Sequence, residues 1–332
     1  MPESRVSHRS RKETSPVVQR EVPGVRFRGQ EVLSIHVSDL HLSHIPPIAR
    51  SAEMNWYRTQ ADYLHQLRAM QDLYSAPIIV AGDIFNSYKE PAELVNYLID
   101  VMPIVHAIPG QHDLPFHRLE DIHKSVYWTL VKAGKIKNLS AVPMRVSDRL
   151  WAMGFPYGVK VHPLEGYGQP CVAVIHSYVW IKGKCYPGAP KERRLARWEE
   201  CLRGYFAAAF GDNHQGFISH IGKTSVINCG TFMRRRIDEI DYKPQVGLLL
   251  SSGKFVWTPL QVKYDKFIDN VILTNLLRHH ENDPKQIQDL VKELKEAGDS
   301  AEDFISFVRR WLERKKIPRD VKNTILLAME AT

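Results

Sequence analysis

The sequence predicts a mixed α/β protein that contains two β-sheets and ends in a small helical appendage. Short apolar runs rich in Val and Ile recur along the chain, and segments of helical periodicity separate the earlier runs. Such runs are typical of strands buried on both faces, and strands that alternate with helices indicate an α/β core. The later runs have fewer helices between them, which suggests a second sheet. Strand signals end near residue 262, and this predicts the helical end.

The expected strands and helices follow from these patterns. Strands are expected at eight apolar runs, residues 32–37, 77–81, 103–108, 150–155, 172–175, 207–210, 225–229 and 246–250. Residues 52–74 and 92–101 carry apolar side chains at roughly helical spacing and are expected to form helices. A loop rich in Gly and Pro begins near residue 182, and the basic segment 191–203 after it is expected to be a helix.

The chain is expected to divide into three parts. Residues 1–28 are polar, charged and without periodicity, which predicts a flexible basic tail. Residues 29–262 form the main domain, and residues 263–332 form the helical appendage. The appendage carries apolar stripes at helical spacing, which pack either on the chain's own core or on a partner. The sequence leaves both possibilities open.

Composition bounds the class of protein. The chain has 332 residues, of which 44% are hydrophobic and 25% charged, as is ordinary for a globular protein. It has no run of 18 uncharged apolar residues and no secretory signal, and its four cysteines are scattered, so we expect a cytoplasmic protein without a membrane span. The formal net charge of +8 predisposes the chain to phosphate-rich polyanions.

Side chains that bind metals follow five of the expected strands. The carboxyl ends of neighbouring parallel strands meet at one edge of a sheet, so these side chains should converge there. Carboxylates and imidazoles together suit a site with two divalent ions, in which one carboxylate bridges the ions. A further imidazole can protonate a departing oxygen. The candidates are Asp39 and His41, Asp83, Gln111, His112 and Asp113, His176, and Asp212 and His214.

In this order, the motifs resemble the signature of the calcineurin-like metallophosphoesterases. The contexts SDLHL, AGDIF, PGQHD, HSYV and GDNH are most similar to DNA repair and recombination nucleases of the SbcD type and their phage relatives. The resemblance covers about residues 31–260. It implies a four-layer α/β/β/α sandwich with the metal ions at one rim.

The resemblance also implies a role for each motif residue. Asp39, His41 and His214 would hold the first ion, Asp83 would bridge, and Gln111, His176 and Asp212 would hold the second. His112 would stabilise the transition state or act as an acid. Asp113 would either steer His112 or merely cap the turn that follows.

Two positions depart from the pattern of the family. The family normally has Asn where Gln111 stands and Gly-His-x-His where this chain has Gly211-Asp212-Asn213-His214. The carboxylate of Asp212 adds negative charge, so we expect Mn²⁺ to be favoured, with Mg²⁺, Fe²⁺ or Zn²⁺ as alternatives.

The preferred function is therefore a two-metal phosphodiesterase, a DNA exonuclease or endonuclease in repair or recombination. The basic segment 191–203 and Arg234 to Arg236 are either solvated faces or contacts to nucleic acid. The resemblance implies an SMC-like coiled-coil ATPase partner bound through the C-terminal helices, and a homodimer also stays open. The alternatives are a phosphatase or phosphodiesterase for small nucleotides or phosphoproteins, and a scaffold that binds nucleic acid or an ATPase without hydrolysis.

Overall fold

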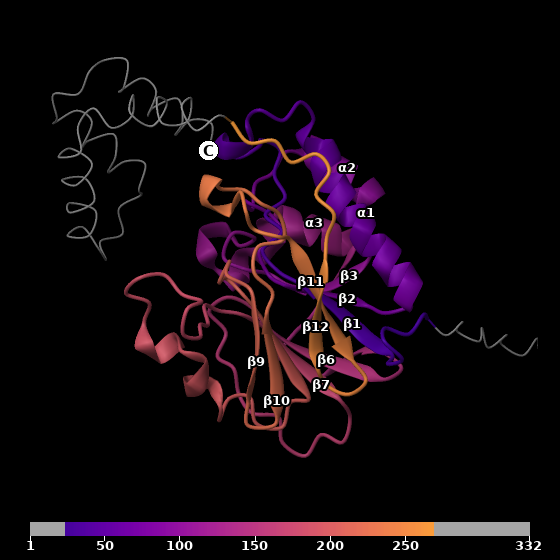
Figure 1. Cartoon of the computed structure of the whole chain (residues 1–332), viewed down its shortest axis with the longest axis vertical. Helices are drawn as coiled ribbons and strands as arrows, with labels where there is room; N and C mark the ends of the chain where they lie inside the picture. The colour runs from indigo at the N-terminus through magenta and orange to yellow at the C-terminus, as the bar shows by residue number, and fades with distance from the viewer. Residues whose placement is uncertain (1–23, 269–332) are drawn as a thin grey trace, which may run out of the picture. The chain divides into compact units, whose positions relative to one another are not determined.

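Two six-stranded sheets form the structure, which is a computed structural model that describes residues 24–268 (Figure 1). The first sheet has the order β12-β11-β1-β2-β3-β4, and the second has the order β5-β6-β7-β8-β10-β9. The strands of the first sheet are β1 (Val32–Val37), β2 (Ile78–Ala81), β3 (Val105–Ile108), β4 (Ile136–Asn138), β11 (Gln245–Leu250) and β12 (Phe255–Pro259). Those of the second are β5 (Met144–Ser147), β6 (Leu150–Phe155), β7 (Cys171–His176), β8 (Ala207–Gly211), β9 (Phe217–Ile221) and β10 (Thr224–Asn228).

The centre of each sheet is parallel. In the first sheet, β1 to β4 pair in parallel, and in the second β6, β7, β8 and β10 do so. Antiparallel strands complete the edges, with β11 and β12 on the first sheet and β5 and β9 on the second. The carboxyl ends of the parallel strands within each sheet therefore lie along one rim, which is where ligands bind in open α/β sheets.

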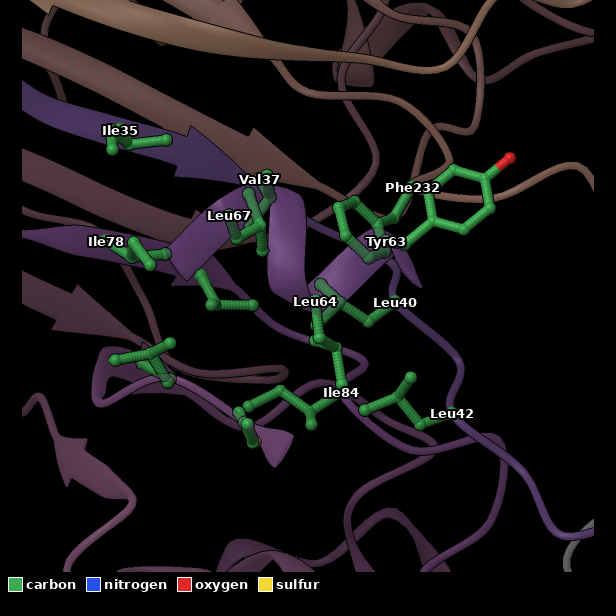
Figure 2. Close-up of a cluster of buried hydrophobic side chains, with 14 of the residues drawn as sticks. Ile35, Val37, Leu40, Leu42, Tyr63, Leu64, Leu67, Ile78, Ile84 and Phe232 are labelled. Atoms are coloured by element: carbon green, nitrogen blue, oxygen red, sulfur yellow. The ribbon is translucent and has the colours of Figure 1, made fainter. Parts of the chain in front are cut away.

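Three α-helices belong to the first sheet: α1 (Trp56–Tyr74), α2 (Ala92–Val101) and α3 (Val126–Lys132). Asn55 caps α1 by accepting a hydrogen bond from the amide of Arg58, and Ser75 ends it in a left-handed conformation. Figure 2 shows Leu64 and Leu67 of α1 in one buried cluster with Val37 and Ile78 of the sheet. Each such side chain stabilises the packing by about 1.5–3 kcal/mol.

Side chains alternate along the buried strands and so fill two separate layers. In β7, Val172 and Val174 face the layer between the two sheets, and Ala173 and Ile175 face the outer side of the second sheet. This outer layer is closed by side chains from loops, including Val179, Leu195, Leu202 and Tyr205. The strands are thus buried on both faces, which is why they read as continuous apolar runs.

The expected two-sheet α/β fold is confirmed, and all eight expected strands are present with small shifts of their ends. The sequence analysis missed β4, β5, β9 and β12, because these edge strands are partly exposed and give no continuous apolar run. It also missed the short helix α3.

The prediction of a basic helix at residues 191–203 was wrong. The segment instead forms two short 3₁₀ turns, η4 (Lys191–Arg193) and η5 (Leu195–Trp198), with Arg194 extended between them. The backbone carbonyl of Trp180 accepts the amide of Leu195, and the amide of Trp180 donates to the carbonyl of Arg193. These long-range hydrogen bonds replace the bonds within a helix. The other 3₁₀ turns are η1 (Ile48–Arg50), η2 (Pro115–His117), η3 (Leu119–Lys124) and η6 (Ile237–Glu239).

The expected tail and appendage lie largely outside the described residues, since residues 1–23 and 269–332 are not part of the described structure. At the start of the described part, the amide of Val25 donates to the carbonyl of Leu73 in α1. At its end, Asp265 pairs with the buried Arg50 at 2.8 Å and accepts from the hydroxyl of Tyr63. Within residues 24–268, no helix has the length and apolar character needed to cross a membrane.

Candidate metal centre

The seven expected metal ligands stand at the ends of strands from both sheets. Asp39 and His41 follow β1, Asp83 follows β2, Gln111 follows β3, His176 ends β7, and Asp212 and His214 follow β8. Two glycines permit this approach. A Cβ on Gly82 would lie 2.1 Å from Nδ1 of His176, and one on Gly110 would lie 2.1 Å from Oδ1 of Asp83. The site therefore depends on bare backbone at these two turns.

Four of these residues have backbones in the left-handed region, with φ of 52° at Asp39, 46° at His41, 50° at Asp83 and 79° at Asp212. A residue with a side chain adopts this conformation at a cost of about 1–3 kcal/mol, and such residues cluster at functional sites. Backbone hydrogen bonds hold the first two turns together: the amide of Asp39 donates to the carbonyl of Gly82, and that of His41 to the carbonyl of Asp83, both at 3.0 Å.

One group of candidate ligands consists of Asp39, His41 and His214, whose ligand atoms all lie within 4.8 Å of one another. Nε2 of His214 lies 3.8 Å from Oδ1 of Asp39 and 3.3 Å from Nε2 of His41. These are the three residues that the sequence analysis assigned to the first ion.

Two further groups share Asp83. It joins Asp39 and His176 in one, and His41 and His112 in the other. Oδ2 of Asp83 lies 3.4 Å from Nε2 of His176 and 3.9 Å from Nε2 of His41. Asp83 thus belongs to two of the three groups, as Asp39 and His41 also do.

Gln111 and Asp212, the two departures from the family pattern, contact each other. Nε2 of Gln111 donates to Oδ1 of Asp212 at 3.0 Å, and Oε1 of Gln111 lies 2.7 Å from Nε2 of His176. The amide oxygen of Gln111 thus lies beside Nε2, the nitrogen of His176 that is directed toward Asp83. Asp212 also donates its backbone amide to both carboxylate oxygens of Asp39.

The charges of the buried ligands are tightly linked. Burial raises the pKa of Asp39 to about 6. Burial alone would lower the pKa of His176, but the neighbouring Asp83 carboxylate raises it to about 10. Burial would raise the pKa of Asp83, but His176 and then His41 hold it well below its usual range. Burial itself holds the pKa of His41 well below its usual range.

These residues fit divalent cations. Oδ2 of Asp83 and Nδ1 of His41 are buried without a hydrogen-bond partner among the described residues, and a buried polar atom without a partner is costly. The carbonyl of Ala81 lies 2.6 Å from Nδ1 of His176, so Nδ1 carries a proton and Nε2 faces Asp83. A carbonyl that fixes one ring nitrogen in this way is typical of metal-binding histidines.

His112 lies at the exposed side of the site. Its backbone amide donates to Oδ1 of Asp83 at 3.0 Å, and its ring is 4.9 Å from that of His41. Nδ1 lies 3.0 Å from the backbone carbonyl of Asn86, which can only accept, so Nδ1 carries a proton and Nε2 is left to exchange one.

Asp113 has a structural position beneath His112. Its buried carboxylate accepts the backbone amides of Gly110, Ile84 and Phe85 at 2.9, 3.2 and 2.8 Å. Burial, with the charge of Asp83, raises its pKa to about 7. Among the two roles left open by the sequence, this geometry is that of a cap: Asp113 fixes the turn, and it reaches His112 only through the backbone.

The sequence analysis did not assign Arg235 to the site, although it noted the basic run 234–236. The guanidinium of this half-buried residue donates to Oδ1 of Asn86 at 2.7 Å, on the residue whose carbonyl holds His112. Its positive charge contributes to lowering the pKa of His41. Its own Nε is buried without a hydrogen-bond partner among the described residues. No spacing signal could have found it, because 149 residues separate the two partners along the chain.

Comparisons with known proteins agree with this geometry at the level of the family. The family model for the calcineurin-like phosphoesterases matches residues 34–222, more than half of the chain. No curated protein matches the chain.

Among solved structures, the chain is similar to sulfate thiohydrolase SoxB from Thermus thermophilus, with 13% identity and a TM-score of 0.42 over 78% of this chain and 61% of that one. It is also similar to a putative 5′-nucleotidase from Staphylococcus aureus, with 14% identity and a TM-score of 0.43 over 72% and 56% of the two chains. For phosphopantetheinyl hydrolase from Mycobacterium tuberculosis the identity is 12% and the TM-score 0.41, over 73% and 100%. The chain thus spans less than two thirds of the first two of these proteins.

The strand-end motifs and the cluster of buried carboxylates and imidazoles lie in the part of the chain that this family model covers, and strands β10 to β12 lie beyond its end. The protein belongs to the calcineurin-like phosphoesterase family, whose members are metal-dependent hydrolases that bind two divalent ions.

Proposed function

We propose that this phosphoesterase is a phosphodiesterase that cleaves DNA, a nuclease of repair or recombination similar to the SbcD type. The observation that carries the proposal is the set of cations around the metal centre. Arg193, Arg197 and Lys160 are exposed and form no ion pair with any residue in the described range 24–268. Arg235 lies on the side of His112. An excess of unpaired cations beside a hydrolytic site attracts polyanionic substrates.

When bound, the two divalent ions would neutralise phosphate oxygens and supply an activated water. Asp39, His41 and His214 would hold one ion, and Gln111, His176 and Asp212 the other, with Asp83 between them. Mn²⁺ is the proposed metal, because the carboxylate of Asp212 stands where the family normally has an imidazole.

His112 performs the part of the reaction that the chain itself supplies. Asn86 fixes the tautomer in which Nε2 is free to exchange a proton. Nε2 would donate a hydrogen bond to the phosphate or a proton to the departing 3′ oxygen when His112 is protonated. The backbone bond from His112 to Asp83 keeps this imidazole in register with the metal ligands.

The test is cleavage of labelled single-stranded and double-stranded DNA with Mn²⁺, with Mg²⁺ and with a chelator. We expect metal-dependent cutting that falls by about 10²–10⁴-fold in His112→Ala and is lost in Asp83→Ala. His220→Ala, an exposed histidine on β9, is the matched control and should cut as the wild type does.

The alternatives give different results. Turnover of aryl phosphate esters with intact DNA would favour an enzyme for small nucleotides or phosphoproteins. Binding of DNA that survives His112→Ala, without cleavage under any metal, would favour a scaffold. Cleavage that begins only when an SMC-like ATPase is added would support the proposed partner. That partner would use residues 263–332, most of which lie outside the described residues.

A further inference from the structure

A cavity opens beside the metal centre, and the proposed mechanism does not use it. It has a volume of about 470 Å³ and lies between the loop after β6 and the turns η4 and η5. Two consecutive residues at the end of β7, His176 and Ser177, line it, and His176 also belongs to the metal cluster. The backbone amide of Tyr157 in the loop donates to the carbonyl of Pro109, just before the turn that carries His112. The cavity therefore shares His176 with the metal cluster.

We propose that this cavity binds a single unpaired nucleotide, the one joined to the phosphate that is cleaved. The inference rests on the proposed phosphodiesterase activity and names its substrate unit. The volume falls in the range of about 300–1,000 Å³ that is typical of small-molecule sites. A site of this size can hold one nucleotide.

The charges that line the cavity favour a phosphate-bearing ligand. Lys160, Arg193 and Arg197 line it, and only Glu192 opposes them. Nη1 of Arg193 donates to Oγ of Ser177, the residue after His176, at 2.6 Å.

Two other arginines of the same region have partners of their own. Arg203 pairs with Glu165 and Glu200 at 3.0 and 2.9 Å, and Arg194 lies over the ring of Trp180. Lys160, Arg193 and Arg197, which line the cavity, form no ion pair with a carboxylate among the described residues.

Two aromatic side chains offer a surface for the base. Tyr157 and Trp198 both line the cavity, one from each wall. Trp198 packs edge-on against Phe210 of β8 with ring centroids 5.0 Å apart, which fixes its orientation. Tyr157 is 36% exposed and stands against the ring of His117. Stacking on such rings tolerates every base, because each base has a π-face. The site would therefore select a nucleotide without reading its sequence.

The experiment compares two substrates that release the same p-nitrophenol. One is bis(p-nitrophenyl) phosphate, and the other is the p-nitrophenyl ester of thymidine 5′-monophosphate, which adds a nucleoside. We expect wild-type kcat/KM to be at least tenfold higher for the nucleotide ester. Arg197→Ala and Tyr157→Ala should each reduce this preference about fivefold to tenfold through KM. Arg194→Ala is the matched control from the same segment and should keep the preference.

Binding of thymidine 5′-monophosphate, measured by calorimetry in the presence of Mn²⁺, gives a second readout that needs no turnover. We expect it to bind at least tenfold more tightly than inorganic phosphate, and Arg197→Ala to remove this advantage. Equal kcat/KM of the wild type for the two esters, or an unchanged preference in both variants, overturns the nucleotide site. The wild type could prefer the nucleotide ester and yet fail to cut DNA. If the variants then lose this preference, the nucleotide site stands and only the nuclease function is overturned.

Discussion

Asp83 accepts the backbone amide of His112 through Oδ1 at 3.0 Å, while its Oδ2 is buried without a hydrogen-bond partner among the described residues. One carboxylate thus joins the turn after β2 to the turn after β3 and keeps a free oxygen toward His41 and His176. This arrangement couples the position of His112, the proposed catalytic residue, to Asp83, the proposed bridging ligand. Metal binding and the geometry of His112 should therefore respond together to changes at Asp83.

Removal of the metal ions should destabilise the protein, because the buried carboxylates of Asp39 and Asp83 lose the cations that compensate them. At an ion concentration 100 times the dissociation constant, one bound ion adds about 2.7 kcal/mol, or roughly 5–10 °C in the unfolding midpoint of a domain of this size. Thermal scans with Mn²⁺ and with a chelator would measure this. Asp83→Ala should abolish the shift and His220→Ala should retain it, and an equal shift in all three proteins would contradict the assignment.

Asn86 and Arg235 should act on catalysis as one unit. The guanidinium of Arg235 holds the side chain of the residue whose carbonyl fixes Nδ1 of His112. We expect Arg235→Ala and Asn86→Ala each to lower kcat about tenfold, and the double variant to lose little more than either. Such non-additivity is typical of residues in one hydrogen-bond network. The kcat for ester hydrolysis by the wild type, the two single variants and the double variant gives the coupling energy between Asn86 and Arg235. Fully additive losses would show that Arg235 acts independently of Asn86.

Asp212→His should change the choice of metal. The substitution restores the imidazole that the family normally has, and it removes one negative charge and the hydrogen bond from Gln111. Imidazole suits zinc better than a carboxylate does, so the ratio of Zn²⁺ to Mn²⁺ bound in competition should rise at least tenfold. Metal analysis after dialysis against equal concentrations of both ions measures the ratio. Gln111→Asn is the companion variant, since it restores the family residue at the other departing position without a change of charge. An unchanged ratio in Asp212→His would remove the basis for preferring manganese.

The centre of the fold and the clustering of the candidate metal ligands could be predicted because both depend on local sequence. A strand such as β7 is buried on both faces and reads as an apolar run, and His176 stands directly at its end. Other features depend on contacts between distant segments. Residues 191–203 fail to form a helix because Leu195 and Arg193 bond to Trp180, and no local pattern shows that.

The same holds for functional residues outside the motifs. Arg235 reaches the site through Asn86, and Tyr157 meets the cavity through a loop that begins after β6. Their roles follow from how the two sheets and their loops are packed. Only ligands that sit within a motif carry a signal in the sequence itself.

Stability should fall in acid partly because of His36, a buried residue of β1 that is not among the metal ligands. Burial lowers the pKa of His36 from 6.5 to about 3 in the folded protein. Between these two values the unfolded chain binds a proton that the folded chain does not, so stability is lost as the pH falls from about 6.5 toward 3. The slope from this one group approaches about 1.4 kcal/mol per pH unit. His36→Leu loses the hydrogen bond with Ser34 at every pH, so its free energy of unfolding should be lower than that of the wild type. This difference in the free energy of unfolding should become smaller as the pH falls. Urea unfolding of both chelator-treated proteins at pH 7.5, 6 and 5 measures the difference. A constant difference across these three values would mean that His36 keeps an ordinary pKa in the folded state.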